Sequence, residues 1–328
     1  MELFFITLIL SSLACVRGQD LNKTIVGCAD LECPPSSADK QSDNCTVTDK
    51  SFGYVGVTRI PTSQKSLQGL SWTKGYTAVD LPNNNRTFQS YFYLGTPPGL
   101  KLNGTGACSV FFNGISTSLS FGGEDGKNET SQGTCADALG SDCVNGLVDH
   151  AKRFVQDSGS NNTDLCSALQ DELRKNVDNA CLHISSGVWT NLTSIDLAGN
   201  APGTVAVQPI SALDNSTSTC WPVLPKQNQL VHVTDYIAQG TLLSGDAQAA
   251  LVAITPILTV FYPTEKDSAV ADIDASLTCV KVVGPPRASL DTINNGTGEG
   301  AAASLSPSSA MLATAMMGSF LAVLFLSI

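Results

Sequence analysis

The sequence predicts an α+β fold in which short β-strands surround an antiparallel helical hairpin and disulfide bonds staple the chain. Three observations predict this class. Apolar residues alternate with polar ones in several segments, as in half-buried strands. In the middle of the chain they recur every three or four residues instead, as in amphipathic helices. The chain also carries 11 cysteines in 328 residues, which is typical of oxidised proteins.

Period-two alternation is clearest near residue 90. One face of that predicted strand carries Phe88, Ser90, Phe92 and Leu94, and the other carries Tyr91 and Tyr93. A second strand is expected from Ile115 to Phe121. Further along, an apolar strand face is formed by Val231, Val233 and Ile237. Continuous apolar runs predict buried strands over 257–262 and 277–283.

Two long helices are expected between these strands. The first has an apolar stripe formed by Val144, Leu147, Val148, Ala151, Phe154 and Val155. The second repeats its apolar residues every four positions, at Leu165, Leu169, Leu173 and Val177, after turn and cap residues at 161–163. A shorter third helix is expected from Ser244 or Asp246 to Ala253.

The two long helices predict one disulfide bond. Cys143 and Cys181 each lie 19 residues from the centre of the turn at residue 162. In an antiparallel hairpin, positions equally far from the turn come level with one another. A Cys143–Cys181 bridge is therefore the first pairing expected.

Residues 1–18 have the pattern of a signal peptide. An apolar run from Leu3 to Leu10 is followed by small or uncharged residues before Gln19, although the start carries Glu2 and no basic residue. A cut after Ala14 would instead leave Cys15 at the new N-terminus. Removal of Cys15 leaves an even number of cysteines, which favours the cut before Gln19.

The C-terminal segment has the pattern of a glycosylphosphatidylinositol (GPI) attachment signal. Residues 310–328 form an uncharged, largely apolar tail, and 284–309 read as a linker and spacer. A membrane-spanning helix would normally carry a Lys/Arg stop on its cytoplasmic side, and none follows this tail. Asn295 is the expected attachment residue, and the alternatives are Asn294, Gly298 and Gly300.

Between these ends, residues 19–283 are expected to form a glycosylated, disulfide-rich ectodomain. It holds eight Asn-x-Ser/Thr sequons, at Asn22, Asn44, Asn85, Asn103, Asn128, Asn161, Asn191 and Asn215. A further sequon at Asn295 overlaps the expected attachment residue. The cysteines expected in disulfides are Cys28, Cys33, Cys45, Cys108, Cys135, Cys143, Cys166, Cys181, Cys220 and Cys279. Three of them, Cys28, Cys33 and Cys45, are expected to staple the N-terminal loop region, and the remaining connectivity stays open.

Composition and motifs exclude several functions. A formal net charge of −11 argues against a nucleic-acid partner. No dinucleotide-binding or phosphate-binding glycine motif is present, so we expect no cofactor. We also expect no metal site, because His150, His183 and His232 show no zinc spacing and the cysteines form no CxxC repeat.

Carboxylates offer the remaining route to catalysis. A glycoside hydrolase needs two carboxyl groups, which the fold must bring together. Glu124 and Asp125 form an acidic pair in a glycine-rich loop, and they are the weak catalytic candidates in this sequence. A solvated turn is the alternative interpretation of this pair.

Four segments resemble those of uncharacterised GPI-anchored surface proteins of filamentous ascomycete fungi: 108–114, 132–139, 219–226 and 254–261. The resemblance implies a cell-surface location and transfers no catalytic residue. We therefore expect a protein on the extracellular face of the plasma membrane, held by a GPI lipid or transferred to the cell wall.

The expected role is non-catalytic, in cell wall structure or surface interaction, with wall polysaccharide or other surface proteins as partners. The alternative is an extracellular carbohydrate-active hydrolase that uses a carboxylate pair on wall polysaccharide. A third interpretation is an adhesin or ligand-binding accessory protein, which would expose an apolar or aromatic patch free of glycans.

Overall fold

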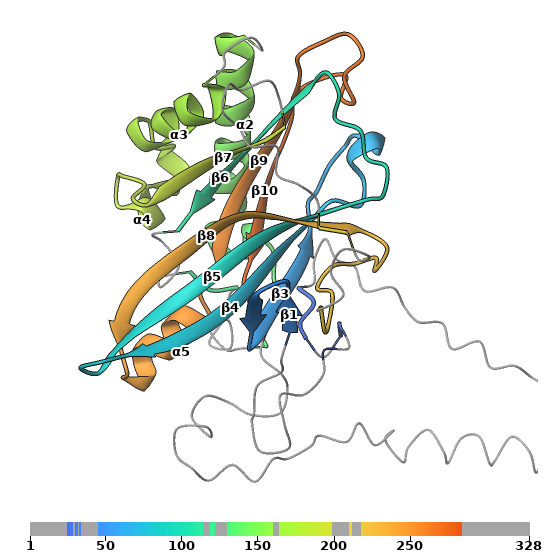
Figure 1. Ribbon diagram of the computed structural model, residues 1–328. Coiled ribbons are helices and arrows are strands. Elements are labelled where there is room, and N and C mark those ends of the chain that lie inside the picture. The colour runs from blue at the N-terminus through green and yellow to red at the C-terminus, as the bar shows by residue number, and fades with distance from the viewer. Residues whose placement is uncertain are drawn as a thin grey trace, which may run out of the picture.

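The computed structural model describes residues 25–28, 30–31, 33, 45–113, 119–121, 130–159, 164–198, 210–211 and 218–283 (Figure 1). The fold is α+β, and four cysteine pairs lie at disulfide distance. The expected signal peptide, linker and apolar tail lie outside the described residues.

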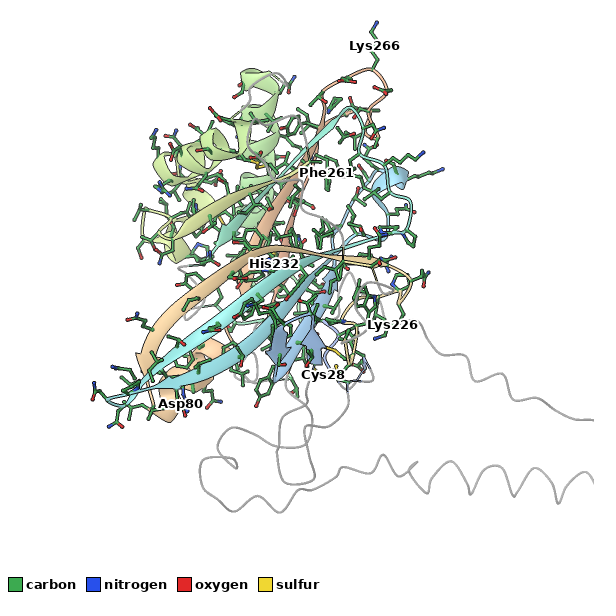
Figure 2. The ribbon with its side chains drawn as sticks, in the orientation of Figure 1. Cys28, Asp80, Lys226, His232, Phe261 and Lys266 are labelled. Atoms are coloured by element: carbon green, nitrogen blue, oxygen red, sulfur yellow. A yellow bond between two sulfur atoms is a disulfide. The ribbon has the colours of Figure 1, made fainter. Side chains whose placement is uncertain are left out.

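The first sheet has four antiparallel strands in the order β3-β4-β5-β8. They are β3 (Tyr54–Arg59), β4 (Ser71–Leu81), β5 (Asn85–Thr96) and β8 (Gln229–Thr241). The last three contain 11, 12 and 13 residues, so they are longer than the short strands expected. The β4–β5 hairpin extends beyond β3 with β8 paired beside it, and Asp80 near the hairpin tip pairs with Arg86 at 2.6 Å (Figure 2).

The second sheet is also four-stranded and antiparallel, in the order β10-β9-β6-β7. Its strands are β6 (Thr105–Phe112), β7 (Leu192–Ala198), β9 (Thr255–Pro263) and β10 (Asp274–Val280). The predicted buried strands over 257–262 and 277–283 correspond to β9 and β10.

A buried aromatic cluster joins the two sheets. The Phe111 ring of the second sheet lies 5.3 Å from the Trp72 ring and 5.0 Å from the Phe92 ring, both from the first sheet. The indole Nε1 of Trp72 donates a hydrogen bond to Oγ1 of Thr259 at 3.0 Å. The predicted alternation along β5 therefore places Phe92 in the core between the sheets.

Helices cover the other face of the second sheet (Figure 1). They are α1 (Cys135–Leu139), α2 (Ser141–Ser158), α3 (Leu165–Lys175), the 3-10 turn η3 (Asn179–Cys181) and α4 (Leu182–Ser185). The predicted stripe of α2 is buried at Leu147, Ala151 and Val155, against sheet residues that include Val110 and Leu258. Residues 160–163, which hold the expected turn, lie outside the described part of the chain.

Smaller elements lie next to the first sheet. The hairpin of β1 (Cys45–Val47) and β2 (Lys50–Phe52) covers its outer face, and the 3-10 turn η1 (Lys65–Leu67) links β3 to β4. The Phe52 ring packs 5.4 Å from Tyr91 and 6.0 Å from Tyr93. A Cβ at Gly75 would lie 2.7 Å from the Phe52 ring, so a glycine is needed there for close packing.

Helix α5 (Ser244–Leu251) follows β8 and packs under the far end of the first sheet. Its buried residues Ala247 and Leu251 contact Tyr76 and Phe88. The third helix expected from the sequence is thus present, and it ends two residues before Ala253.

A β-bulge in β8 corrects one predicted strand face. The pairing with β5 shifts between Phe92 and Tyr93, so that Val233 has no direct partner. Val231 and Val233 face the core as predicted, but beyond the bulge Tyr236 turns inward and Ile237 is 57% exposed. The extra residue reverses the alternation, which a strict period-two pattern cannot represent.

The strand expected from Ile115 to Phe121 lies mostly outside the described residues. Residues 119–121 are described and are not part of a strand. Leu119 and Phe121 are nevertheless buried beneath the helices, so their apolar character reflects core packing and not strand formation.

The disulfides join distant parts of the chain. The four pairs are Cys45–Cys220, Cys108–Cys166, Cys135–Cys279 and Cys143–Cys181. The last is the pair expected from the sequence, although α3 ends at Lys175 and Cys181 lies in η3. The bridges fix the helices to the second sheet and the β1 hairpin to the segment before β8.

Candidate functional site

A cavity of about 300 Å³ lies between the first sheet, the end of β6 and helix α5. The rings of Tyr76, Phe88 and Tyr236 form part of its wall. Alanine residues from α5 and β8 leave the space open, because their side chains are short. Concave sites with an apolar wall and a few fixed polar groups are typical of small-molecule binding.

Lys74 is the charged residue at the buried end of this cavity. Because side chains alternate along β4, Lys74 points to the same face as Trp72 and Tyr76, and it is 1% exposed. Its Nζ donates to the carbonyl oxygen of Ala253 at 2.8 Å and to Oγ1 of Thr255 at 3.1 Å. Both acceptor residues also line the cavity.

The electrostatic environment of Lys74 disfavours its charge. Burial, together with the smaller effect of the nearby Lys281 ammonium, lowers the pKa of the Lys74 amine to about 7. Within the described part of the chain, no carboxylate forms an ion pair with Lys74. The Phe92 ring lies 5.8 Å from Nζ and gives only a weak cation–π contact.

Asn113, just after β6, adds an unsatisfied polar group to the cavity wall. It is 5% exposed. Its Nδ2 donates to Oγ1 of Thr193 at 3.3 Å, and its backbone N–H donates to the carbonyl of Asn191 at 3.2 Å. Its Oδ1 is buried and has no hydrogen-bond partner among the described residues. Such a group costs about 1–3 kcal/mol, so it is a natural contact for a bound donor.

Asp246 is the acidic residue among the described residues of the cavity wall. Its Oδ2 accepts hydrogen bonds from the backbone N–H and the hydroxyl of Thr241, at 3.0 and 2.7 Å. These bonds hold the pKa of Asp246 below its usual value. The carboxylate therefore fixes the β8–α5 connection and is not paired with a second carboxyl group.

Asn191, a predicted glycosylation site, also lines the cavity. It is exposed and adopts a left-handed conformation with φ of 53°, which asparagine tolerates well. Asn85 and Asn103 are likewise exposed. The remaining glycosylation candidates lie outside the described residues: Asn22, Asn44, Asn128, Asn161 and Asn215.

The catalytic candidates Glu124 and Asp125 also lie outside the described residues. So do all four candidate attachment residues, Asn294, Asn295, Gly298 and Gly300.

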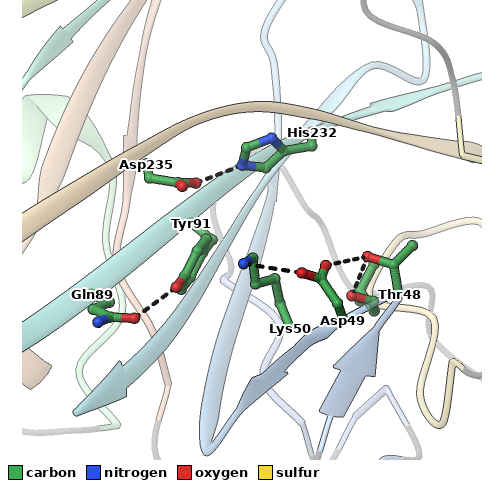
Figure 3. Close-up of polar contacts among 8 residues, drawn as sticks. Thr48, Asp49, Lys50, Gln89, Tyr91, His232 and Asp235 are labelled. Atoms are coloured by element: carbon green, nitrogen blue, oxygen red, sulfur yellow. Dashed lines mark hydrogen bonds and ion pairs between the residues drawn. The ribbon is translucent and has the colours of Figure 1, made fainter. Parts of the chain in front are cut away.

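A second polar cluster lies on the outer face of the first sheet (Figure 3). Nε2 of His232 contacts Oδ1 of Asp235 at 2.5 Å, and the Tyr91 hydroxyl donates to Gln89 at 2.6 Å. The side chains of His232 and Asp235 are 42% and 39% exposed. Both side chains are therefore partly open to solvent, and the open sheet face gives a ligand little enclosure.

Exposed apolar side chains gather at the far end of the first sheet. They belong to the ends of β4 and β8 and to the β8–α5 connection: Val79, Leu81, Ile237, Leu242 and Leu243. The backbone N–H of Leu242 donates to Asn84, next to the sequon residue Asn85. A sequon therefore lies beside this exposed apolar surface.

The sulfur atoms of Cys33, Cys45 and Cys220 lie within 4.8 Å of one another. Cys45 and Cys220 are joined as a disulfide, so they offer no thiolates to a metal ion. Cys33 lies beside this bridge but forms no disulfide within the described part of the chain, so the disulfide expected for it is not found there.

Sequence reasoning missed Lys74 and Asn113. A signal was present, because Lys74 has the same strand parity as Trp72 and Tyr76 and so falls on a face that aromatic residues mark as buried. Asn113 directly follows the apolar run of β6, which also indicates a buried position. Neither pattern shows that the two residues share one cavity.

No helix in the described ranges is long and apolar enough to cross a membrane. Comparison of the chain with protein-family models, with curated proteins and with solved structures finds no match.

Proposed function

We propose that this protein is a GPI-anchored, N-glycosylated cell-surface protein that acts in surface interaction by binding and not by catalysis. The cavity beside α5 is the observation that supports binding most directly. Its polar groups are held in place by neighbouring backbone and side-chain atoms, and its one described carboxylate is engaged by Thr241. Fixed polar groups in an apolar hollow select a ligand, whereas glycoside hydrolysis needs two facing carboxyl groups.

The surface location is proposed from the two ends of the chain. Residues 1–18 would direct secretion, 284–309 would be the linker and spacer, and 310–328 the apolar tail, and the lipid at Asn295 would replace residues 296–328. The exposed sequons Asn85, Asn103 and Asn191 and the disulfide pairs are compatible with an oxidising, glycosylating route. Wall polysaccharide and other surface proteins remain the proposed partners.

Two finer features belong to the same proposal. We place the chain with the surface proteins of filamentous ascomycete fungi on the four similar segments given above. We also propose that α2 and α3 form an antiparallel hairpin. The side chains of His150 on α2 and Glu172 on α3, 3.0 Å apart, support this arrangement.

The anchor can be tested by expressing the full chain in a eukaryotic secretory host. We expect a phosphatidylinositol-specific phospholipase to release the protein from the cell surface. Deletion of residues 296–328 should send it into the medium without any treatment. Retention of the truncated chain in the membrane would contradict the anchor.

The non-catalytic role needs a separate measurement. The purified full chain should release no reducing sugar from cell wall polysaccharide, and Glu124→Ala with Asp125→Ala should change nothing. Hydrolysis that is lost in this double variant would instead establish the carbohydrate-active alternative.

A further inference from the structure

We propose that the cavity beside α5 binds a small hydroxylated carboxylate, with the carboxylate at Lys74 and a hydroxyl group at Asn113. This inference rests on the proposed binding role and deepens it by naming a ligand class. It does not depend on the lipid anchor. Two groups in the cavity support it: among the described residues, the Lys74 amine has no anion beside it and Oδ1 of Asn113 has no hydrogen-bond donor.

Lys74 supplies the first half of the argument. An ammonium group buried in protein is normally paired with a carboxylate, because an isolated charge loses its hydration. The described acceptors of Lys74 are two neutral oxygen atoms, which leave one of its three N–H groups for another partner. A ligand carboxylate at this point would supply the missing negative charge in a water-poor site.

Asn113 supplies the second half. Its Oδ1 is buried and accepts no hydrogen bond from any described residue, while its Nδ2 donates to Thr193. An acceptor of this kind is satisfied by a ligand hydroxyl or N–H group. A ligand that carries both a carboxylate and a donor therefore completes the two polar groups that the fold leaves incomplete.

The remaining cavity wall limits the size and nature of the ligand. A volume of about 300 Å³ is at the lower end for small-molecule sites and suits a ligand of about the size of one sugar acid. The rings of Tyr76 and Tyr236 can pack against its carbon chain and offer hydroxyl groups beside it. Asp246 does not compete for Lys74, since its carboxylate is engaged by Thr241.

Anion binding at Lys74 is expected to be coupled to proton uptake. The pKa of Lys74 is lowered to about 7, so much of the amine is neutral at pH 7.5 and a carboxylate would favour its protonation. The other titratable groups near the amine are Lys281, Tyr76, Tyr236 and Asp246. Of these, burial raises the pKa of Tyr76 and hydrogen bonds lower that of Asp246, so neither changes charge between pH 6 and 9.

The test uses the full chain purified in detergent and three six-carbon probes. D-gluconate carries a carboxylate and hydroxyl groups, D-sorbitol carries hydroxyl groups only, and hexanoate carries a carboxylate only. We expect calorimetry to show gluconate binding at least about 10-fold tighter than either comparator. Repeating the titration in buffers of different ionisation enthalpy should reveal proton uptake on binding.

Variants separate the two contacts. Lys74→Met should weaken gluconate binding about 50-fold or more, and Lys74→Arg should retain binding without proton uptake because arginine stays charged. Asn113→Ala should weaken gluconate binding about 10-fold and leave hexanoate binding unchanged. Lys65→Met, on the exposed η1 turn, is the matched control and should bind as the wild type does.

Two results would overturn the inference and can be told apart. If sorbitol binds as well as gluconate, or if Lys74→Met binds gluconate normally, the carboxylate assignment is wrong while the binding role survives. If none of the three probes binds, and a broader set of small polar molecules also fails, the proposed binding role falls with it.

Discussion

Lys74 lies in an environment that a lysine seldom occupies, and this affects stability as well as binding. Its side chain extends from the inward face of β4, and its amine donates a hydrogen bond to the carbonyl oxygen of Ala253. The same buried position that makes the amine a binding group also makes its protonation costly in the folded state. A functional explanation is attractive, because an apolar side chain would fill this space at lower cost.

The pH dependence of stability provides a direct check on this residue. The folded pKa of Lys74 is about 7 and the unfolded value is near 10.5, so between these pH values the unfolded chain binds the extra proton. The free energy of unfolding should therefore rise with pH, by up to about 1.4 kcal/mol per pH unit from this group. Below pH 7 the residue is charged in both states and the full penalty applies.

Urea denaturation between pH 7 and 9.5 measures this effect. Lys74→Met should lose the rising contribution and be more stable than the wild type near pH 7. Lys65→Met should keep the wild-type slope, because Lys65 is exposed. Identical slopes for the wild type and Lys74→Met would show that the amine is not buried in solution.

At the scale of elements, the β-bulge in β8 decides which residues reach the cavity. Without the unpaired Val233, Ile237 would continue the inward face that begins at Val231. The bulge instead brings Tyr236 inward, where its ring lines the cavity. A one-residue irregularity in a strand thus builds part of the candidate site.

The bulge predicts unequal effects for two residues that look equivalent in the sequence. Val231 is 8% exposed, so Val231→Thr should lower the free energy of unfolding by about 1–2 kcal/mol, since it buries a hydroxyl group. Ile237 is 57% exposed, so Ile237→Thr should change the stability by less than about 0.5 kcal/mol. Urea denaturation of the two variants provides the measurement, and equal losses would argue for a regular strand.

At the scale of the whole molecule, the disulfides tie together segments that are far apart in the chain. Cys135–Cys279 joins α1 to β10 across 144 residues, whereas Cys143–Cys181 joins α2 to η3 across 38. A longer closed loop restricts the unfolded chain more strongly. The layered packing of helices on the second sheet therefore depends on long-range covalent links as well as on its apolar core.

Removal of each bridge should show this difference. We expect Cys135→Ala with Cys279→Ala to cost about 1 kcal/mol more than Cys143→Ala with Cys181→Ala, out of losses of about 2–5 kcal/mol each. All four cysteines are buried, so packing losses are similar in the two double variants. Thermal unfolding of both provides the comparison, and a larger loss for the shorter loop would contradict the loop-length argument.

The sequence by itself determined the α+β class, the inward face of β5, the apolar stripe of α2 and the position of α5. Each depends on a repeat of two or about 3.6 residues, which local geometry imposes on any chain that buries one face. It also placed Cys143 opposite Cys181, although the helix assumed to reach Cys181 ends earlier.

Only the tertiary structure decided the long strands of the first sheet, the bulge at Val233 and the presence of Lys74 and Asn113 in one cavity wall. Lys74 belongs to the first sheet and Asn113 directly follows β6 of the second, so their place in one cavity depends on how the sheets and α5 pack. Sequence periodicity reports which face of an element is buried, but not which other element covers it. The candidate site depends on which elements cover Lys74, because its charge becomes a binding group only when neighbouring elements exclude water from it.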